Sequence, residues 1–124
     1  MYIDCNVARL GIDLMTLNGG KMYGPKQSGV LYVRSGVVLH PMMTGGGQEF
    51  GYRSGTENVA FAVGFAKALE LAARGRSDRF KKTAALRDWF MAQLETQLGA
   101  QITGHRKYRA ANNIHMIFDG ADNE

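Results

Sequence analysis

Cysteine is almost absent from this chain, and long apolar runs are absent altogether. A single cysteine, Cys5, excludes an internal disulfide framework. No apolar run approaches the length of a membrane span. The opening residues 1–5 lack the basic region and the apolar core of a signal peptide. We therefore expect a cytoplasmic protein with no membrane partner.

Metal-binding and nucleic-acid-binding patterns are also missing. The three histidines, His40, His105 and His115, show no metal-ligand spacing with cysteine or carboxylates, so we expect no metal site. The formal charge is +4, and the basic residues gather in two stretches, 74–82 and 105–109. A basic cluster can bind nucleic acid, but a solvated helix face is the simpler interpretation. No aromatic residues alternate with these charges as they do in single-strand binders, so we expect no nucleic-acid partner.

The remaining composition predicts an α/β protein. The 124 residues are 45% apolar and 21% charged, enough for a modest domain with a core. Residues 12–17 and 28–34 are predicted strands, the second rich in β-branched and aromatic residues. Residues 37–42 are a third extended segment, which Pro41 would place at a sheet edge.

Two helices and two short strands follow. Apolar residues surround most of the predicted helix 57–74, so we expect it to be largely buried. Gly75 fits its C-cap, and Ser77 or Asp78 the next N-cap. The second helix, 78–98, is amphipathic and ends at Gly99. The charged residues expected mostly outside its apolar stripe are Arg79, Lys81, Lys82, Arg87 and Glu95. Strands are expected near residues 101–103 and over 113–118.

Lys21 is the first candidate functional residue. It follows a strand within the glycine-rich sequence Leu-Asn-Gly-Gly-Lys-Met-Tyr-Gly-Pro-Lys, residues 17–26. This layout suits a lysine presented from a strand edge, where its amine can act as a nucleophile. The alternative is an ordinary surface lysine in a turn.

The second candidate is the loop 45–58, which reads Gly-Gly-Gly-Gln-Glu-Phe-Gly-Tyr-Arg-Ser-Gly-Thr-Glu-Asn. Its glycines permit close backbone approach. Ser54, Thr56 and the free amides of a helix start would form an anion site suited to a phosphate. The alternative for Thr56 is a plain helix N-cap.

Together these segments resemble the cysteine desulfurases of the NifS/IscS type, which are aminotransferase class V enzymes that use pyridoxal phosphate. Family members read Ser-x-His-Lys-x-Tyr-Gly-Pro-Lys-Gly, then Gly-Ala-Leu-Tyr-Val-Arg, Gly-Gly-Gly-(Gln/His)-Glu and Arg-(Ser/Ala)-Gly-Thr-x-Asn. The matching positions in this chain are residues 21–26, 29–34, 45–49 and 53–58. The order and spacing agree, and the resemblance extends more weakly to the chain end.

The resemblance implies roles for four residues. Lys21 matches the lysine that forms the Schiff base with pyridoxal 5'-phosphate. Thr56 matches a threonine that reaches the cofactor phosphate across a dimer interface. Asn18 stands where the family has a serine that contacts the phosphate, and its amide can donate the same bond. Gly20 replaces the usual histidine, which removes a ring beside the lysine.

The resemblance also implies the fold and its division. It predicts part of the fold type I pyridoxal-phosphate transferase fold. Residues 1–75 would be the C-terminal part of the cofactor-binding large domain, and residues 76–124 the beginning of an α+β small domain. The chain is thus interpreted as an internal segment of a longer enzyme. Cys5 matches no catalytic position, and we expect it to be a small buried hydrophobe.

The implied activity is conversion of L-cysteine to L-alanine, with sulfur passed to an enzyme cysteine as a persulfide. A homodimer and a sulfur-acceptor protein are the implied partners, and iron-sulfur cluster or thio-cofactor synthesis is the implied use. The isolated chain is expected to be inactive. The alternatives are a selenocysteine lyase or other class V enzyme, and a non-catalytic truncated interaction module with exposed apolar surface.

Overall fold

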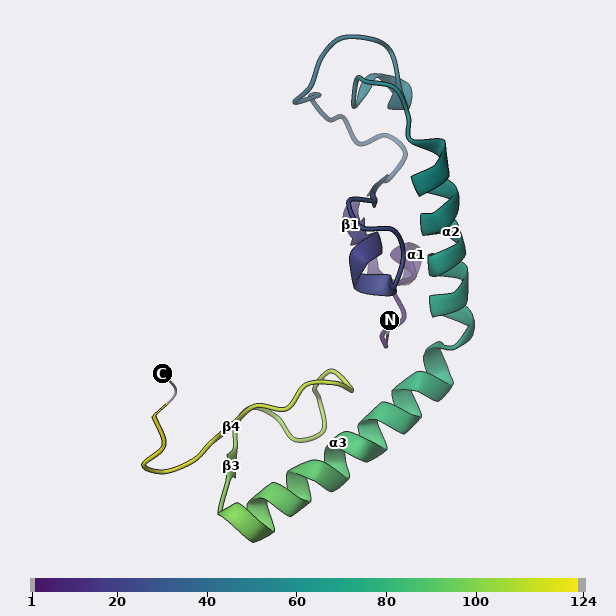
Figure 1. Ribbon diagram of the computed structural model, residues 1–124. Coiled ribbons are helices and arrows are strands. Elements are labelled where there is room, and N and C mark those ends of the chain that lie inside the picture. Colours follow the sequence, from purple (N-terminus) through teal and green to yellow (C-terminus); the bar gives the residue numbers. More distant parts are fainter. Residues whose placement is uncertain (1, 123–124) are drawn as a thin grey trace. The chain divides into compact units, whose positions relative to one another are not determined.

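The computed structural model describes residues 2–122, and these form two compact units (Figure 1). The first unit is Cys5–Ala73. The second combines residues 2–4 with residues 74–122. Each unit contains both helix and strand, as the predicted α/β composition requires.

An antiparallel hairpin is the sheet of the first unit. Its strands are β1 (Leu14–Asn18) and β2 (Gly29–Val33), paired from Leu14 opposite Val33 to Asn18 opposite Gly29. Both predicted strands are confirmed. A single-turn helix, α1 (Val7–Leu10), precedes them. The sequence did not predict α1, because four residues are too few to show a helical period.

The predicted third extended segment is wrong. Residues 37–42, all of which the structure describes, are neither helix nor strand. Pro41 has no amide hydrogen to donate to a ladder, which weakens this segment as a strand. An apolar, β-branched composition alone is therefore not enough to make this segment a strand.

Helix α2 (Val59–Arg74) begins two residues later than predicted and ends where predicted. Its N-cap is Asn58, whose Oδ1 accepts a hydrogen bond of 3.1 Å from the amide of Phe61. The interpretation of Thr56 as the N-cap is therefore wrong, and the cap lies two residues further along.

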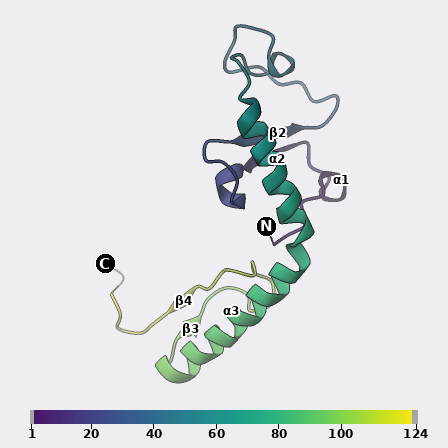
Figure 2. The ribbon, with the colours of Figure 1, turned by 45° about the vertical axis from the view of Figure 1, so that its right-hand side comes forward.

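The expectation that α2 is largely buried is also wrong. Its buried residues, Phe65, Ala68 and Ala72, form a single face, and the hairpin lies against this face at Phe65 and Ala68 (Figures 1 and 2). Val63 on another face is 65% exposed. Other apolar residues of α2 are also largely exposed, among them Val59 at 68% and Leu71 at 53%.

The second unit contains one long helix and a small sheet. Helix α3 (Arg76–Leu98) is followed by β3 (Gln101–Ile102), which pairs antiparallel with β4 (Met116–Ile117). The predicted end of α3 is confirmed, because Gly99 takes the left-handed conformation, with φ 63°, that a C-cap glycine adopts. The start is two residues earlier than predicted, and Gly75, rather than Ser77 or Asp78, is its N-cap.

Arg87 is buried in this unit, which corrects its expected place outside the apolar stripe. Only 7% of Arg87 is exposed, beside the buried apolar residue Met91 on the same helix. Its guanidinium contacts the Asp88 carboxylate at 2.8 Å and donates to the carbonyl of Ala110 at 3.0 Å. A buried charge needs such partners, and the acceptor on a distant loop is invisible to a helical pattern.

Across residues 2–122, no helix is both long enough and apolar enough to cross a bilayer.

The capping geometry gives a stability prediction. Asn58→Ala removes the acceptor for the Phe61 amide and should lower the free energy of unfolding by about 1 kcal/mol. Thr56→Ala is the matched control and should change it by less than about 0.5 kcal/mol. Denaturant titration of both variants without cofactor measures the difference. An equal loss in the two variants would contradict the assignment of the cap.

Candidate functional site

Lys21 lies at the tip of the β1–β2 hairpin. The 3₁₀ helix η1 (Gly19–Met22) continues directly from β1 and carries it. The tip is closed by the amide of Gly19, which donates to the Ser28 carbonyl at 2.8 Å, and by the amide of Gly24, which donates to the Gly19 carbonyl at 2.9 Å. Lys21 is thus held on a turn with fixed hydrogen bonds, and not on a loose loop.

Asn18, Gly20 and Lys21 are all exposed at this tip. Asn18 is the last residue of β1, and its side chain makes no capping bond to η1. A Cβ atom at Gly20 would lie 3.2 Å from Asn18 Oδ1, so the amide of Asn18 occupies the space beside the missing side chain. The three neighbouring predicted residues therefore present an amine and an amide group from one turn.

The glycine loop, residues 43–55, is closed by its own hydrogen bonds. Ser54 donates from its hydroxyl to the carbonyl of Thr44 at 3.0 Å and from its amide to the carbonyl of Met43 at 3.3 Å. The side-chain oxygen of Gln48 accepts from the Gly55 amide at 3.2 Å. Thr56 follows directly after Gly55, so these hydrogen bonds fix the point at which the chain leaves the loop.

The short 3₁₀ helix η2 (Glu49–Gly51) lies inside this loop. Its three residues all have positive φ, between 50° and 79°. Phe50 is one of them and is 97% exposed. Non-glycine residues in this conformation are uncommon, and they gather at functional sites.

The closure corrects the predicted anion site. The hydroxyl proton of Ser54 and the amide of Gly55 are already engaged within the loop, and the Phe61 amide is engaged by Asn58. The hydroxyl of Thr56 is exposed and, within residues 2–122, is recorded in no hydrogen bond. Of the predicted donors, Thr56 is the side chain that stays available to an anion.

The structure does not join the two candidate segments. No hydrogen bond or ion pair between Lys21 and Thr56 is recorded within the described residues. Lys21's turn contacts α2 at Phe65 and Ala68, which lie six and nine residues after the first residue of that helix. Thr56 lies before the first residue. Because an α-helix rises about 1.5 Å per residue, the turn of Lys21 and the segment of Thr56 lie at different heights along the axis of α2.

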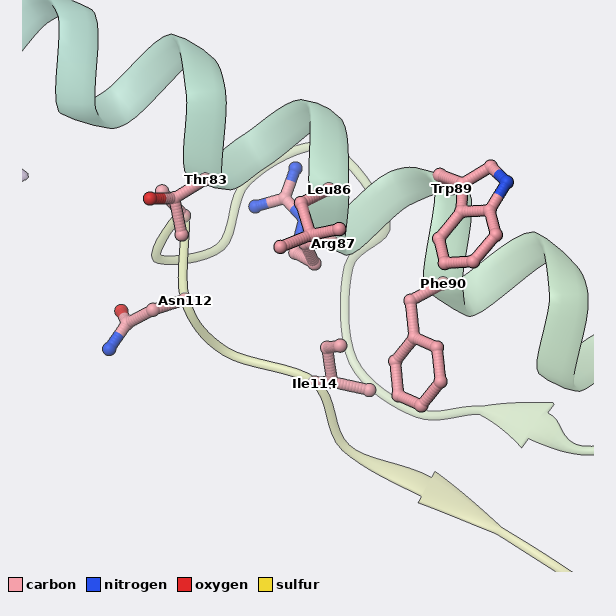
Figure 3. A pocket seen from close by; sticks show the side chains of 8 residues that line it. Thr83, Leu86, Arg87, Trp89, Phe90, Asn112 and Ile114 are labelled. Atoms are coloured by element: carbon pink, nitrogen blue, oxygen red, sulfur yellow. The ribbon is translucent and has the colours of Figure 1, made fainter.

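A pocket of about 380 Å³ lies in the second unit, on α3 (Figure 3). Phe90 extends from the helix toward Ile114, and both line an apolar wall. The polar groups of the lining belong to Thr83, Arg87 and Asn112. It contains none of the predicted site residues, and the cationic group in its wall is already paired with Asp88. We do not assign the chemistry to this pocket.

Cys5 is exposed, so its interpretation as a buried hydrophobe is wrong. It lies at the beginning of the first unit, two residues before the first residue of α1. Within the described part of the chain, no group of three or more His, Cys, Asp or Glu side chains could hold a metal ion.

Comparisons with known proteins agree on one family. The aminotransferase class-V family matches residues 1–124. The chain is 40% identical to the cysteine desulfurase IscS of Dictyoglomus turgidum, over 99% of this chain and 32% of that protein. It is 38% identical to cysteine desulfurase IscS 1 of Archaeoglobus fulgidus, over 98% and 32%. A solved NifS-like protein superposes with a TM-score of 0.82 at 37% identity, over 89% of this chain and 30% of that one.

The chain therefore spans about a third of the length of the curated relatives that it matches. The predicted fold class, part of the fold type I pyridoxal-phosphate transferase fold, is confirmed by the superposition. The sequence did not predict two features, the hydrogen bond by which Gln48 closes the glycine loop and the burial of Arg87. Neither follows a periodic pattern, since each depends on a side chain that bonds to a backbone group elsewhere.

The loop closure gives a second prediction. Gln48→Ala removes the acceptor for the Gly55 amide, a loss of about 1 kcal/mol, so that amide should exchange with solvent about fivefold faster. Amide hydrogen exchange measures this directly. Gln97→Ala is the control, because that glutamine bonds Gln93 within α3. Equal exchange in Gln48→Ala and the unsubstituted protein would contradict the closure.

Proposed function

The chain belongs to the aminotransferase class-V family, and from this premise we propose that it supplies the cofactor-linking lysine of a pyridoxal-phosphate-dependent cysteine desulfurase. The observation that carries the proposal is Lys21, held at the tip of a hydrogen-bonded hairpin with its side chain exposed. The 40% identity to a cysteine desulfurase supports the choice of reaction.

The residues present fit two ends of pyridoxal 5'-phosphate. The amine of Lys21 suits a covalent link to the cofactor aldehyde. The side-chain amide of Asn18 and the hydroxyl of Thr56 are exposed donors suited to the phosphate. When bound, the cofactor withdraws electrons from the substrate carbon that it holds. Lys21 Nζ then holds and returns the proton that moves during the reaction.

Thr56 is proposed to act on the cofactor of a second copy of the chain. Within residues 2–122, no hydrogen bond or ion pair joins Lys21 and Thr56, yet each has an exposed group suited to the same ligand. A homodimer in which each copy provides Thr56 to the other's Lys21 reconciles these observations. The strongly exposed Phe50, in the loop that precedes Thr56, gives such an interface an apolar residue to bury.

We assign residues 1–75 to the end of the cofactor-binding large domain and residues 76–124 to the beginning of the small domain. The break in the contacts falls between Ala73 and Arg74, next to Gly75 at the junction of α2 and α3. Cys5 is not proposed as the sulfur-accepting residue, because it precedes Lys21 and matches no family motif.

The proposed reaction converts L-cysteine to L-alanine and passes the sulfur to an enzyme cysteine as a persulfide. A sulfur-acceptor protein would then carry it to iron-sulfur cluster or thio-cofactor synthesis in the cytoplasm. A polypeptide limited to these 124 residues is proposed to be inactive. A related class V reaction, such as that of a selenocysteine lyase, is the alternative, and product analysis with L-cysteine and L-selenocysteine separates the two.

An interaction module without catalysis is a second candidate. Large exposed apolar residues support it, among them Met42 at 97% exposure and Val63 at 65%. Light scattering across a concentration series tests this candidate. A monomer at every concentration would oppose it, while self-association without cofactor binding would favour it over the enzyme.

Covalent trapping tests the proposed role of Lys21. The full-length natural protein, incubated with pyridoxal phosphate and reduced with borohydride, should carry the added mass on the peptide that contains Lys21. Lys21→Ala should lose the label entirely, because no other amine occupies that place. Lys26→Ala, an exposed lysine in the same hairpin connection, should keep it. A label that survives in Lys21→Ala would overturn the proposal.

The proposed phosphate donors predict weaker binding without loss of the covalent link. Asn18→Ala and Thr56→Ala each remove one hydrogen bond to a charged group, a loss of about 1.5 kcal/mol or more. The dissociation constant for pyridoxal phosphate should rise about tenfold or more in each variant. Ser54→Ala is the control, because its hydroxyl donates to Thr44, and it should change affinity less than either. Equilibrium titration of the cofactor measures all three.

A further inference from the structure

We propose that Gly64 of α2 is a positioning residue for Lys21, because its missing side chain lets the hairpin tip approach the helix closely. The inference rests on the proposed function of Lys21, since it concerns how that lysine is held. Gly64 belongs to neither candidate segment, and its role comes from contacts between a helix and a distant turn.

The contact itself joins Gly64 and Pro25. A Cβ atom at Gly64 would lie 2.7 Å from Pro25 Cγ and 3.2 Å from Pro25 Cδ. Real Cβ atoms do not approach a carbon atom to 2.7 Å, and a proline ring has no free rotation by which to move away. Alanine at position 64 therefore requires Pro25, and the turn that contains it, to move away from α2.

Two glycines of the hairpin tip also lie close to α2. A Cβ atom at Gly24 would lie 3.0 Å from Ala68 Cβ, and one at Gly19 would lie 3.1 Å from a ring carbon of Phe65. Gly19 and Gly24 also close the turn, through the bond from the Gly24 amide to the Gly19 carbonyl. The same residues that form the Lys21 turn thus place it against α2.

Ser28 completes this contact surface. Its hydroxyl donates to the Pro25 carbonyl at 2.6 Å, and the hydroxyl oxygen of Ser28 occupies the place where a Gly19 Cβ would be. Pro25 is therefore held by Ser28 on one side and faces Gly64 on the other. A shift of Pro25 away from α2 would disturb the connection that carries Lys21.

Most of the buried residues of the first unit lie where the Lys21 turn packs against α2. Five of residues 5–73 are buried, and four of them take part in the contact: Gly19, Ser28, Phe65 and Ala68. Lys21 is exposed on the same turn. The turn is thus packed beneath while Lys21 remains accessible, which suits a lysine that must meet a cofactor at a fixed place.

Helix propensity makes the test sharper. Glycine in a helix interior is less favourable than alanine by about 1 kcal/mol, so Gly64→Ala should stabilise α2 if packing played no part. The proposed contact predicts a loss of cofactor affinity instead. Helix propensity alone therefore gives no reason for weaker cofactor binding or for faster exchange of the Gly24 amide in Gly64→Ala.

The experiment uses the full-length natural protein in five forms: unsubstituted, Gly64→Ala, Pro25→Ala, the double variant, and Ala66→Gly as a control at an exposed position of α2. Two quantities are measured in each, the dissociation constant for pyridoxal phosphate and the exchange rate of the Gly24 amide. Gly64→Ala should raise both by about tenfold or more, since small misplacements of reacting groups have large effects. Ala66→Gly should change both by less than about threefold.

The double variant isolates the contact. Alanine at position 25 has neither Cγ nor Cδ, so adding Gly64→Ala to Pro25→Ala should change both quantities by less than about threefold. An effect of Gly64→Ala that is as large in the Pro25→Ala background as in the unsubstituted protein would overturn the inference. If Gly64→Ala alone does not fold, folding of the double variant supports the inference. Failure of both while Pro25→Ala folds overturns it.

The two proposals fail separately. A Lys21 that is labelled, with unchanged affinity and exchange in Gly64→Ala, overturns the positioning role and leaves the proposed function standing. A Lys21 that is never labelled overturns the proposed function. In that case the Gly24 exchange rate still decides whether Gly64 holds the turn: faster exchange supports that holding role, and unchanged exchange overturns it.

Discussion

The close approach between the hairpin tip and α2 is the contact on which the first unit depends. Among residues 2–122, no large side chain is completely buried, and in this unit Phe65 is the one large apolar residue in the core. The first unit therefore buries little apolar area, and close packing of the turn against α2 holds much of the turn in place. Small residues on both sides, Gly19 and Gly24 facing α2 and Gly64 facing Pro25, make that packing possible. Lys21 gains a defined place without itself being buried.

The second unit is ordered by different means. There, guanidinium groups bind backbone carbonyls and hold the connection between β3 and β4. Arg87 reaches the carbonyl of Ala110, while Arg109 donates to the carbonyls of His105 and Thr103. A guanidinium group carries five N–H donors in a fixed planar arrangement, so it can hold several carbonyls in defined directions, whereas a lysine has three donors on a flexible stem. The unit therefore keeps a folded connection around a core whose fully buried member is the small residue Ala111.

Regular elements were predictable from the sequence because they leave a periodic pattern or a stop signal. The strand 28–34 shows β-branched residues, and Gly99 marks the end of α3. The closeness of Lys21 and Asn18 was predictable for a simpler reason, since Lys21 is the third residue after Asn18 along the chain, whereas their roles at the cofactor stay a prediction. The Asn58 cap could not be separated from Thr56 by residue type alone, since both can cap a helix. The hydrogen bond from the Gly55 amide to Gln48 and the close approach of Pro25 to Gly64 are contacts between separate segments. No local sequence pattern predicts such contacts.

Asn18 and Gly20 lie so close that the side chains tolerated at the two positions depend on each other. A Cβ atom at position 20 would lie 3.2 Å from Asn18 Oδ1, closer than most side-chain contacts, so a larger residue there requires the amide to shift. The resembled family has the shorter serine at the first position and histidine at the second. A shorter residue at position 18 leaves more space for a side chain at position 20. The geometry of this turn therefore constrains the pair of residues together, and not each position alone.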